Sequence, residues 1–538
     1  MPNQPTMTTR KEVFTGAQPP TENGRAQRDT PPIPPLSLQQ RFLRAAALLT
    51  TAYLCVMFLV HPLVFSNYYF NITETKQAFF LTASGIYLLL LLFVRIALPP
   101  DFGVAKEKFS LHPAAVALFA FFAVSLVGGL LSHYPGEVFF GENNRYQGLL
   151  TLFCYALLVF ALSRREIDLV WPERVLLLGA CVVSLLGVLH HYGIDPLGFT
   201  TNLRESDRGR FLSTIGNADF YAGYIVLAFS VSLGFFLRAK TKRTRVLSAL
   251  ILALVSFGTL VAGSDSAALG LLAAVAFAPL LLFSDHAALR RLPLGWAVFF
   301  LSAFVFGMLS SVLKSVTFLS SFFAVLRRPA VSLTFAAVSL ALWLALTRVS
   351  PERLSRAKRP YAITLVCALL AGGIALVLLN TLLRALPLGA LERYVHFSES
   401  WGTDRGKIWT LVLRVYARLP FAQQLFGASS GALFHADAVS PIFSDAGLDT
   451  AHNEYLQYLV TNGALGLICY LAALVFAIRA GLERSKTEPI YRGLTLAVAA
   501  YAVQAAVNIA QPMTTPLFLV LIGVLVSRKS AIDSPSAS

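Results

Sequence analysis

The stretch 451–463, AHNEYLQYLVTNG, places a cluster of polar side chains immediately before a long apolar run. Polar groups at the mouth of a membrane span are costly to bury, so they usually serve a function. His452 can act as a general base, because the ordinary pKa of histidine lies near neutrality. A lone histidine at a membrane interface is otherwise a helix cap or a satisfied hydrogen-bonding group. The role of His452 therefore depends on the groups that the fold brings beside it.

Two arginine-containing stretches are suited to binding an anion. In DRGRFLSTIGNADFYAGYIVL, Arg208 and Arg210 precede a turn at Gly216-Asn217 and then an apolar run. Basic side chains and open backbone N–H groups at a helix N-terminus form a natural anion site. The stretch GENNRYQGLL places Arg145 in the same arrangement. Either set can instead be an ordinary interfacial anchor.

A third stretch, TDRGKIWTLVLRVYARL at 403–419, has the apolar spacing of an amphipathic helix. At about 100° per residue, Arg405 lies roughly 160° from the basic stripe of this helix, on the face of Trp409. We expect Arg405 to point toward protein or a buried site, where it either pairs structurally or binds an anion. The basic stripe, predicted to face solvent or lipid headgroups, consists of Lys407, Arg414 and Arg418.

Acidic residues offer an alternative chemistry. Asp265, in the tight turn VAGSDSAALG, can pair with an arginine or face solvent. A carboxylate–metal site would be built around Asp265 or Asp404, and Glu454 is the alternative to His452 as a base. The sequence shows no zinc-ligand spacing, no glycine-rich phosphate loop and no Ser/His/Asp set, and its five cysteines are scattered through apolar segments. We therefore predict chemistry without a metal or cofactor.

The composition predicts that these residues are positioned by a membrane protein. The 538 residues are 56% hydrophobic and only 13% charged, with a mean hydropathy of +0.65, whereas a soluble chain carries about twice that charged fraction. The formal net charge of +16 is compatible with nucleic-acid binding, but the basic residues lie mostly in short loops between apolar runs, as in membrane proteins. We expect the lipid bilayer, and no nucleic acid, as a partner.

Apolar runs of about 20 residues are long enough to cross a bilayer as helices. The sequence predicts fourteen of them and hence an all-α, polytopic membrane helix bundle. The predicted spans are 43–64, 77–97, 113–131, 147–163, 172–190, 218–237, 245–262, 266–283, 294–313, 329–347, 361–381, 455–478, 492–510 and 514–527.

The charge of the connecting loops predicts the orientation. With fourteen spans, the basic loops 238–245, 348–359 and 479–492 fall on the same side as both termini, and that side is expected to be cytoplasmic. The outer face then carries 132–147, 190–217 and one long segment, 382–451, with amphipathic helices. We divide the chain into a disordered cytoplasmic tail at 1–40, an N-terminal transmembrane half at 41–245, a core at 246–480 that includes this long segment, and C-terminal helices at 481–538.

Several of these stretches together resemble the O-antigen ligase and polymerase superfamily. HNEYLQYLVTNGALGL resembles its His-Asn signature with Gly-x-x-Gly-Leu following, and DRGKIW at 404–409 resembles its Arg-x-x-Ile-Trp element. LFGASSG at 425–431 resembles the glycine-rich turn between them. RFLSTIGNADFYAGY and GENNRYQGLLT also fit. The resemblance covers most of residues 132–475, with the motifs in the same order.

The resemblance implies a GT-C-like bundle in the bacterial inner membrane. Such enzymes transfer a glycan from an undecaprenyl-diphosphate carrier to a glycan or lipid acceptor on the outer face. Carried over, His452 activates the acceptor hydroxyl, while Arg405 and Arg210 hold the diphosphate, with help from Arg208 or Arg145. Arginine forks stabilise a leaving diphosphate without a metal, and nearby arginines keep a histidine neutral and able to accept a proton. Supporting roles fall to Asn453, Asn217, Asp265 and Trp409.

The sequence departs from the family pattern at two places. Asn217-Ala218-Asp219 stands where the family has Asn-Pro-Asn, and Ser264-Asp265 stands where it often has Ser-Arg, so one arginine of the clamp is missing or replaced. Ligase, repeat-unit polymerase and protein O-glycosyltransferase share this core, and the sequence does not separate them. A lipid-linked glycan transporter or flippase is the alternative of another class. It predicts charged or interrupted helices near the membrane midplane.

Overall fold

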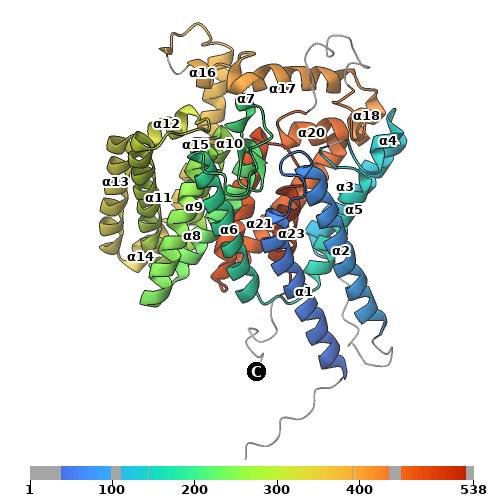
Figure 1. Ribbon diagram of the computed structural model, residues 1–538, viewed down its shortest axis with the longest axis horizontal. Helices are drawn as coiled ribbons and strands as arrows, with labels where there is room; N and C mark the ends of the chain where they lie inside the picture. Colours follow the sequence, from blue (N-terminus) through green and yellow to red (C-terminus); the bar gives the residue numbers. More distant parts are fainter. Residues whose placement is uncertain (1–37, 98–110, 143, 390–391, 436–449, 529–538) are drawn as a thin grey trace, which may run out of the picture.

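The computed structural model describes residues 38–97, 111–142, 144–389, 392–435 and 450–528 (Figure 1). The predicted disordered tail lies outside these residues up to position 37. Within the described ranges, twelve helices are long and apolar enough to cross a membrane, if α14 (Pro351–Arg356) is counted with α15 and the short η3 (Ala505–Val507) with α22. The protein is therefore an all-α, multi-pass membrane protein.

The twelve long helices match twelve of the predicted spans in position. They are α1 (Leu38–Leu63), α2 (Ile72–Ile96), α3 (Pro113–Leu130), α6 (Val170–His191), α8 (Ala218–Arg238), α9 (Lys242–Ala262), α10 (Asp265–Leu282), α11 (His286–Val312), α13 (Pro329–Thr347), α15 (Lys358–Asn380), α21 (Gly463–Arg484) and α22 (Ile490–Gln504). Two shorter apolar helices, α5 (Leu149–Ser163) and α23 (Thr515–Leu525), occupy the predicted spans at 147–163 and 514–527.

The short elements gather at one end of the bundle, the upper end in Figure 1. A two-stranded antiparallel hairpin there pairs Phe211 with Asn217. We call this end of the bundle the upper end. Its elements are α4 (Pro135–Val138), α7 (Glu205–Arg208), β1 (Phe211–Leu212), β2 (Gly216–Asn217), α12 (Ser321–Leu326), α16 (Glu392–Val395), α17 (Trp401–Arg418), α18 (Phe421–Phe426) and α20 (Glu454–Thr461).

The basic loops meet at the opposite, lower end. A cavity of about 1280 Å³ is lined there by Lys240, Arg245 and Arg484, which come from two of the three loops. The third loop contains α14, which lies at the lower end in Figure 1 and whose Ser355 Oγ is 2.9 Å from Nε2 of His286 at the start of α11. The predicted segregation of basic loops from the long segment around α17 is thus present in the fold.

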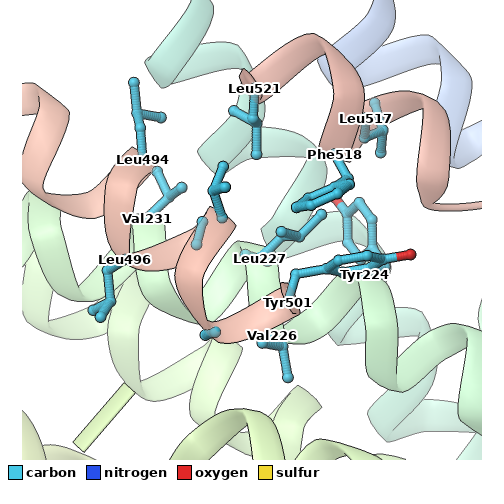
Figure 2. Packing of buried hydrophobic residues seen from close by; sticks show 14 of the residues in the cluster. Tyr224, Val226, Leu227, Val231, Leu494, Leu496, Tyr501, Leu517, Phe518 and Leu521 are labelled. Carbon is cyan, nitrogen blue, oxygen red and sulfur yellow. The ribbon is translucent and has the colours of Figure 1, made fainter. Parts of the chain in front are cut away.

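The centre of the bundle is α8, packed mainly against α22 and α9, and side chains of α8, α22 and α23 meet in one buried cluster (Figure 2). In the part of α8 that is long enough to cross a membrane, 89% of the residues are buried inside the protein. Gly234 and Gly493 let the backbones of α8 and α22 approach closely, because a Cβ on Gly234 would collide with Gly493. The ring of Tyr501 stacks on Phe518 with 4.2 Å between centroids. Close packing of this kind holds helices together in a membrane, where burial from water contributes little.

The amphipathic helix at 403–419 is confirmed, with one difference. Residues 402–404 have left-handed backbone conformations, so regular helix begins at Arg405. The apolar face of α17 is buried in a second core together with residues from 428–433 and 451–460. The predicted basic stripe is exposed, and Arg405 is buried as expected, with 8% of its surface accessible.

The expected continuous helix over 455–478 is wrong. The structure breaks it into α20 and α21 at Asn462 and Gly463, and Gly463 has a φ of +73°. A side chain at Gly463 would collide with the carbonyl oxygen of Leu425, because the glycine-rich turn at 425–431 passes directly against the break. Sequence periodicity does not reveal this approach, since the two segments are remote in the chain.

The same turn satisfies the carbonyl groups that the break frees. The N–H of Ala428 donates to the carbonyl of Val460 at 2.9 Å, and the N–H of Ser429 donates to that of Thr461 at 2.9 Å. Asn462 Nδ2 donates to Ser125 Oγ on α3 at 2.7 Å. An interrupted helix is stable near a membrane only where protein groups replace the lost hydrogen bonds, and this turn supplies them.

Gly463→Ala tests the break. The alanine must hold a left-handed conformation and meets the Leu425 carbonyl, so we expect a loss of stability of about 1–3 kcal/mol, seen as a lower thermal midpoint of the purified protein in nanodiscs. Gly372→Ala is the matched control, because nothing lies within 4 Å of its added Cβ in α15. Equal midpoints for the two variants would contradict the described break.

Candidate functional site

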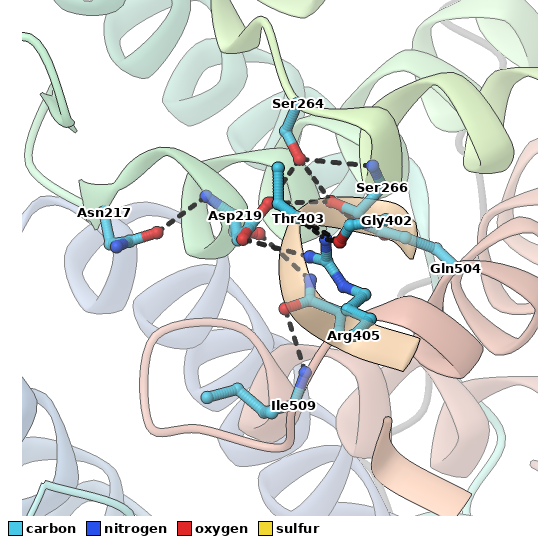
Figure 3. A network of polar contacts seen from close by, with 10 residues as sticks. Asn217, Asp219, Ser264, Ser266, Gly402, Thr403, Arg405, Gln504 and Ile509 are labelled. Carbon is cyan, nitrogen blue, oxygen red and sulfur yellow. Dashed lines mark hydrogen bonds and ion pairs between the residues drawn. The ribbon is translucent and has the colours of Figure 1, made fainter. Parts of the chain in front are cut away.

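Arg405 lies at the centre of a polar network at the upper end (Figure 3). One terminal nitrogen of its guanidinium is 3.4 Å from Oδ2 of Asp219 at the start of α8. The other donates to the carbonyl of Gly402 at 2.8 Å and to Oγ1 of Thr403 at 2.9 Å. The remaining donor, Nε, is buried and has no hydrogen-bond partner. The left-handed turn at 402–404 thus folds back to hold the arginine of its own helix.

Asp219 connects this arginine to three other segments. Its carboxylate accepts hydrogen bonds from Ser264 Oγ and, at 3.4 Å, from Ser266 Oγ at the start of α10. Its backbone carbonyl accepts from Asn508 Nδ2 at 3.0 Å, just beyond α22. Asn217 caps α8 by accepting from the N–H of Asp219 at 2.8 Å. The starts of α8, α10 and α17 and the segment after α22 therefore meet at one residue, Asp219.

Of the two placements open to Asp265, pairing with an arginine or facing solvent, the structure shows the second. Its side chain is exposed, and the ion pair of Arg405 is with Asp219. The neighbouring Ser264 caps α10 and faces the network instead. In the sequence, Asp219 stands out only because it replaces the second asparagine of the family's Asn-Pro-Asn motif. The signal that marks it is an acidic residue in the first turn of an otherwise apolar span, which is costly unless paired.

His452 lies before α20 and not on it. Asn453 is the N-cap of α20, since its Oδ1 accepts from the N–H groups of Tyr455 and Leu456 at 3.0 and 3.1 Å. His452 is half-buried with a φ of +44°. His452 therefore shares no helical face with the residues of α20, because that helix begins only after the cap at Asn453. The supporting role of Asn453 is structural.

The second core places the His452 segment beside the helix of Arg405. Ala451 and Leu456, which flank His452, pack with Val412 and Val415 of α17. The N–H of Ala451 also donates to Gln457 Oε1 at 2.9 Å, which closes the turn around His452. Two of the predicted catalytic residues, His452 and Arg405, are therefore carried by segments that pack directly on one another.

The other predicted arginines are placed less deeply. Arg145 is half-buried and lines two cavities, one of about 30 Å³ shared with Thr450 and Gln457, and one of about 530 Å³ shared with Asn217. Arg208 and Arg210 have exposed side chains. The carbonyl of Arg210 accepts from the N–H at position 218 at 2.9 Å, so its chain adjoins the start of α8. Arg405 is the buried member of the predicted set.

Trp409 lies one turn after Arg405 in an aromatic cluster. Its ring centroid is 5.3 Å from that of Trp401 and 6.0 Å from that of Phe397. The indole Nε1 of Trp409 is buried without a hydrogen-bond partner. Its expected supporting role next to Arg405 is compatible with this placement, and an indole N–H without a partner is a donor available to a polar ligand.

Backbone strain is concentrated at the upper end. Among the described residues, eight non-glycine residues have positive φ, and all of them lie in the segments that form this end. Left-handed conformations of such residues cost free energy and cluster at functional sites. They are Tyr68, Asn144, Tyr146, Ser213, Thr403, Asp404, Ser429 and His452.

Glu454 is a second candidate proton acceptor, fully buried beneath His452. Tyr470 donates its hydroxyl to Oε1 of Glu454, while Oε2 has no hydrogen-bond partner. Burial raises the pKa of Glu454 to about 7. The surrounding hydroxyls belong to Tyr155, Tyr455, Tyr458, Tyr470 and Tyr501.

The described residues contain no group of three or more His, Cys, Asp or Glu side chains arranged to hold a metal ion. Chemistry without a metal stays a prediction. No family model matches the chain, and no curated protein matches it. What the site can do chemically therefore has to be argued from its own residues. They combine a buried guanidinium, a carboxylate partner and two side chains that can accept a proton, the imidazole of His452 and the carboxyl group of Glu454.

The pKa of Glu454 predicts a pH-dependent stability. Between the ordinary value of 4.5 and about 7 the folded state retains a proton that the unfolded chain loses, so this residue destabilises the protein as pH rises through that window. Glu454→Gln removes the effect. We expect its thermal midpoint relative to wild type to rise between pH 5 and pH 8, by the equivalent of up to about 3 kcal/mol.

Glu483→Gln is the control, since Glu483 is exposed at the end of α21 and its ion pair with Arg479 is exposed too. Its midpoint should stay parallel to that of wild type across the same range. A Glu454→Gln curve that is also parallel to wild type would mean that the folded protein does not bind the extra proton.

Proposed function

We propose that the protein is a membrane glycosyltransferase that moves a glycan from an undecaprenyl-diphosphate carrier to an acceptor hydroxyl. The observation that carries the proposal is the buried guanidinium of Arg405. It is held by Asp219 with Nε unpaired, and it lies on a helix that packs against the His452 segment. The motif resemblance supplies the reaction class, and the geometry is compatible with it.

In the proposed reaction, the acceptor oxygen attacks the anomeric carbon of the lipid-linked sugar. The bond between that carbon and the phosphate oxygen breaks, and the lipid diphosphate leaves with the electron pair. Arg405 stabilises the negative charge as it develops, since a guanidinium fork fits a phosphate. His452 takes the proton of the acceptor hydroxyl. Arg145, Arg208 and Arg210 add positive charge around the diphosphate.

We also propose how the protein is oriented in the membrane. The basic loops at the lower end are assigned to the cytoplasm, so the upper end and its site face the outside of a bacterial inner membrane, with both termini in the cytoplasm. A lipid-linked donor fits this geometry because its diphosphate lies at the membrane surface while its polyprenyl chain remains in the bilayer.

Ligase, repeat-unit polymerase and protein glycosyltransferase remain open as acceptor classes. A transporter or flippase is the second candidate, because interrupted helices are common at transport sites. Those interruptions lie near the membrane midplane, whereas the break between α20 and α21 lies toward the upper end. The two classes differ in a purified system. The transferase releases undecaprenyl diphosphate from the donor in detergent, whereas a flippase relocates the donor in liposomes and leaves it intact.

Arginine substitutions test the diphosphate role. Arg405→Ala should lower transfer by about 10²–10³-fold, as when one preorganised charge-stabilising donor is removed. Arg405→Lys should also be poor, because a point charge does not replace a planar fork. Arg414→Ala, an exposed position on the same helix, should transfer like wild type. Full activity of Arg405→Lys and Arg405→Ala with purified donor and acceptor would exclude the role.

Histidine substitutions test the base. His452→Ala should lower transfer by about 10²–10⁴-fold while the protein still binds the lipid-linked donor. His452→Gln can accept a hydrogen bond but cannot carry away a proton, so its activity separates positioning from base chemistry. Glu454→Gln is the comparison. If it abolishes transfer while His452→Ala does not, the carboxyl group of Glu454 is the base.

Cysteine labelling tests the orientation. In a cysteine-free background, Ser206→Cys at the upper end should react with an impermeant maleimide added to whole spheroplasts. Lys242→Cys at the lower end should react only after permeabilisation. Both positions are exposed. The reverse pattern would place the site on the cytoplasmic side and remove the proposed donor from its reach.

A further inference from the structure

The cavity of about 530 Å³ at the upper end has the make-up of a sugar-binding site. It lies between the loop before α2, the β1–β2 hairpin, the start of α8 and the loop before α5. Its walls include the aromatic rings of Tyr69, Phe211 and Phe220. Its volume is within the range of small-molecule sites, which pair apolar walls with a few placed polar groups.

The aromatic wall is fixed by hydrogen bonds behind it. The hydroxyl of Tyr69 donates to the carbonyl of Ser213 at 2.7 Å and lies 3.2 Å from Nδ1 of His190. The N–H of Ser213 donates to the same Nδ1 at 3.1 Å, so that nitrogen is an acceptor. The ring of Tyr69 lies 4.9 Å from that of Phe211. These bonds tie the wall to the end of α6 and hold it without a ligand.

The polar side of the cavity carries planar groups: two side-chain amides, each with donors and an acceptor, and one guanidinium, which has donors only. Asn144, in a left-handed conformation, accepts from Thr73 Oγ1 at 3.2 Å, which orients its amide. Arg145 and Asn217 also line the cavity. Amide and guanidinium groups bind adjacent hydroxyls in pairs, while aromatic faces cover the apolar C–H faces of a sugar ring. The combination fits a pyranose better than a wholly apolar ligand.

The cavity adjoins the candidate site formed by Arg405 and the His452 segment. It shares Glu142 and Arg145 with the small cavity lined by Thr450 and Gln457, next to His452. It also reaches Asn217, two residues before the partner of Arg405. A sugar held here adjoins the small cavity beside the His452 segment, because Glu142 and Arg145 line both cavities.

We propose that this cavity binds a pyranose ring of the acceptor glycan. The assignment to the acceptor rests on the proposed transfer reaction, whereas the binding of a sugar does not. The donor diphosphate belongs with Arg405, and the cavity then holds the acceptor beside Arg145, which it shares with the cavity next to the His452 segment.

The first test measures binding alone. Saturation-transfer NMR of the full chain in nanodiscs uses methyl glucopyranoside, methyl N-acetylglucosaminide and methyl galacturonide as probes. We expect saturable binding of at least one probe. Phe220→Leu and Asn144→Gly should each weaken it about tenfold, and glycine keeps the left-handed backbone of position 144. Phe421→Leu, an exposed aromatic on α18, should bind like wild type.

Absence of saturable binding for all three probes, or binding unchanged in both cavity variants, would overturn the proposal. Kinetics with purified donor and acceptor then assign the sugar. The cavity variants should raise the KM for acceptor and leave the KM for donor unchanged, and the reverse result would overturn the acceptor assignment. Sugar binding without any transfer would instead reject the proposed function and leave the sugar site standing.

Discussion

The ion pair between Arg405 and Asp219 is the interaction on which the upper end depends. It joins α17, which lies over the bundle, to the first turn of α8, the most buried of the twelve membrane-length helices in the described ranges. An arginine with 8% exposure is tolerated when its charge is paired, and both terminal nitrogens of Arg405 have partners, while Nε has none. The turn at 402–404 and the serines at the start of α10 complete the compensation. Removing Asp219 would leave the guanidinium buried without a counter-charge.

The second constraint is the break between α20 and α21. It requires the turn at 425–431 to lie against Gly463, because only that turn satisfies the freed carbonyls of Val460 and Thr461. The second core is formed by the same turn, α17 and the residues around His452. The break, the turn and the placement of His452 are therefore one structural unit, and a change in any part moves the histidine relative to Arg405.

The site offers two possible proton acceptors in different surroundings. His452 is half-buried at the surface of the upper end, while Glu454 lies in a tyrosine-lined interior that raises its pKa to about 7. A carboxyl group kept neutral at such a depth avoids the cost of burying a charge. His452 is nearer to a solvent-borne acceptor, and Glu454 is better placed to hold α20 against α21 through Tyr470.

The sequence by itself determined the membrane class, the positions of the spans, the grouping of the basic loops and the inward direction of Arg405. Each of these follows from composition or from periodicity within one segment, so no distant contact is needed to predict them. The tertiary structure alone decided that Asp219 and not Asp265 pairs with Arg405, across 186 residues of chain. It also decided that the helix breaks at Gly463 and that His452 precedes α20. These features depend on hydrogen bonds and close contacts between segments that are remote in the chain. The residue pattern within one segment does not show which remote segment will lie against it.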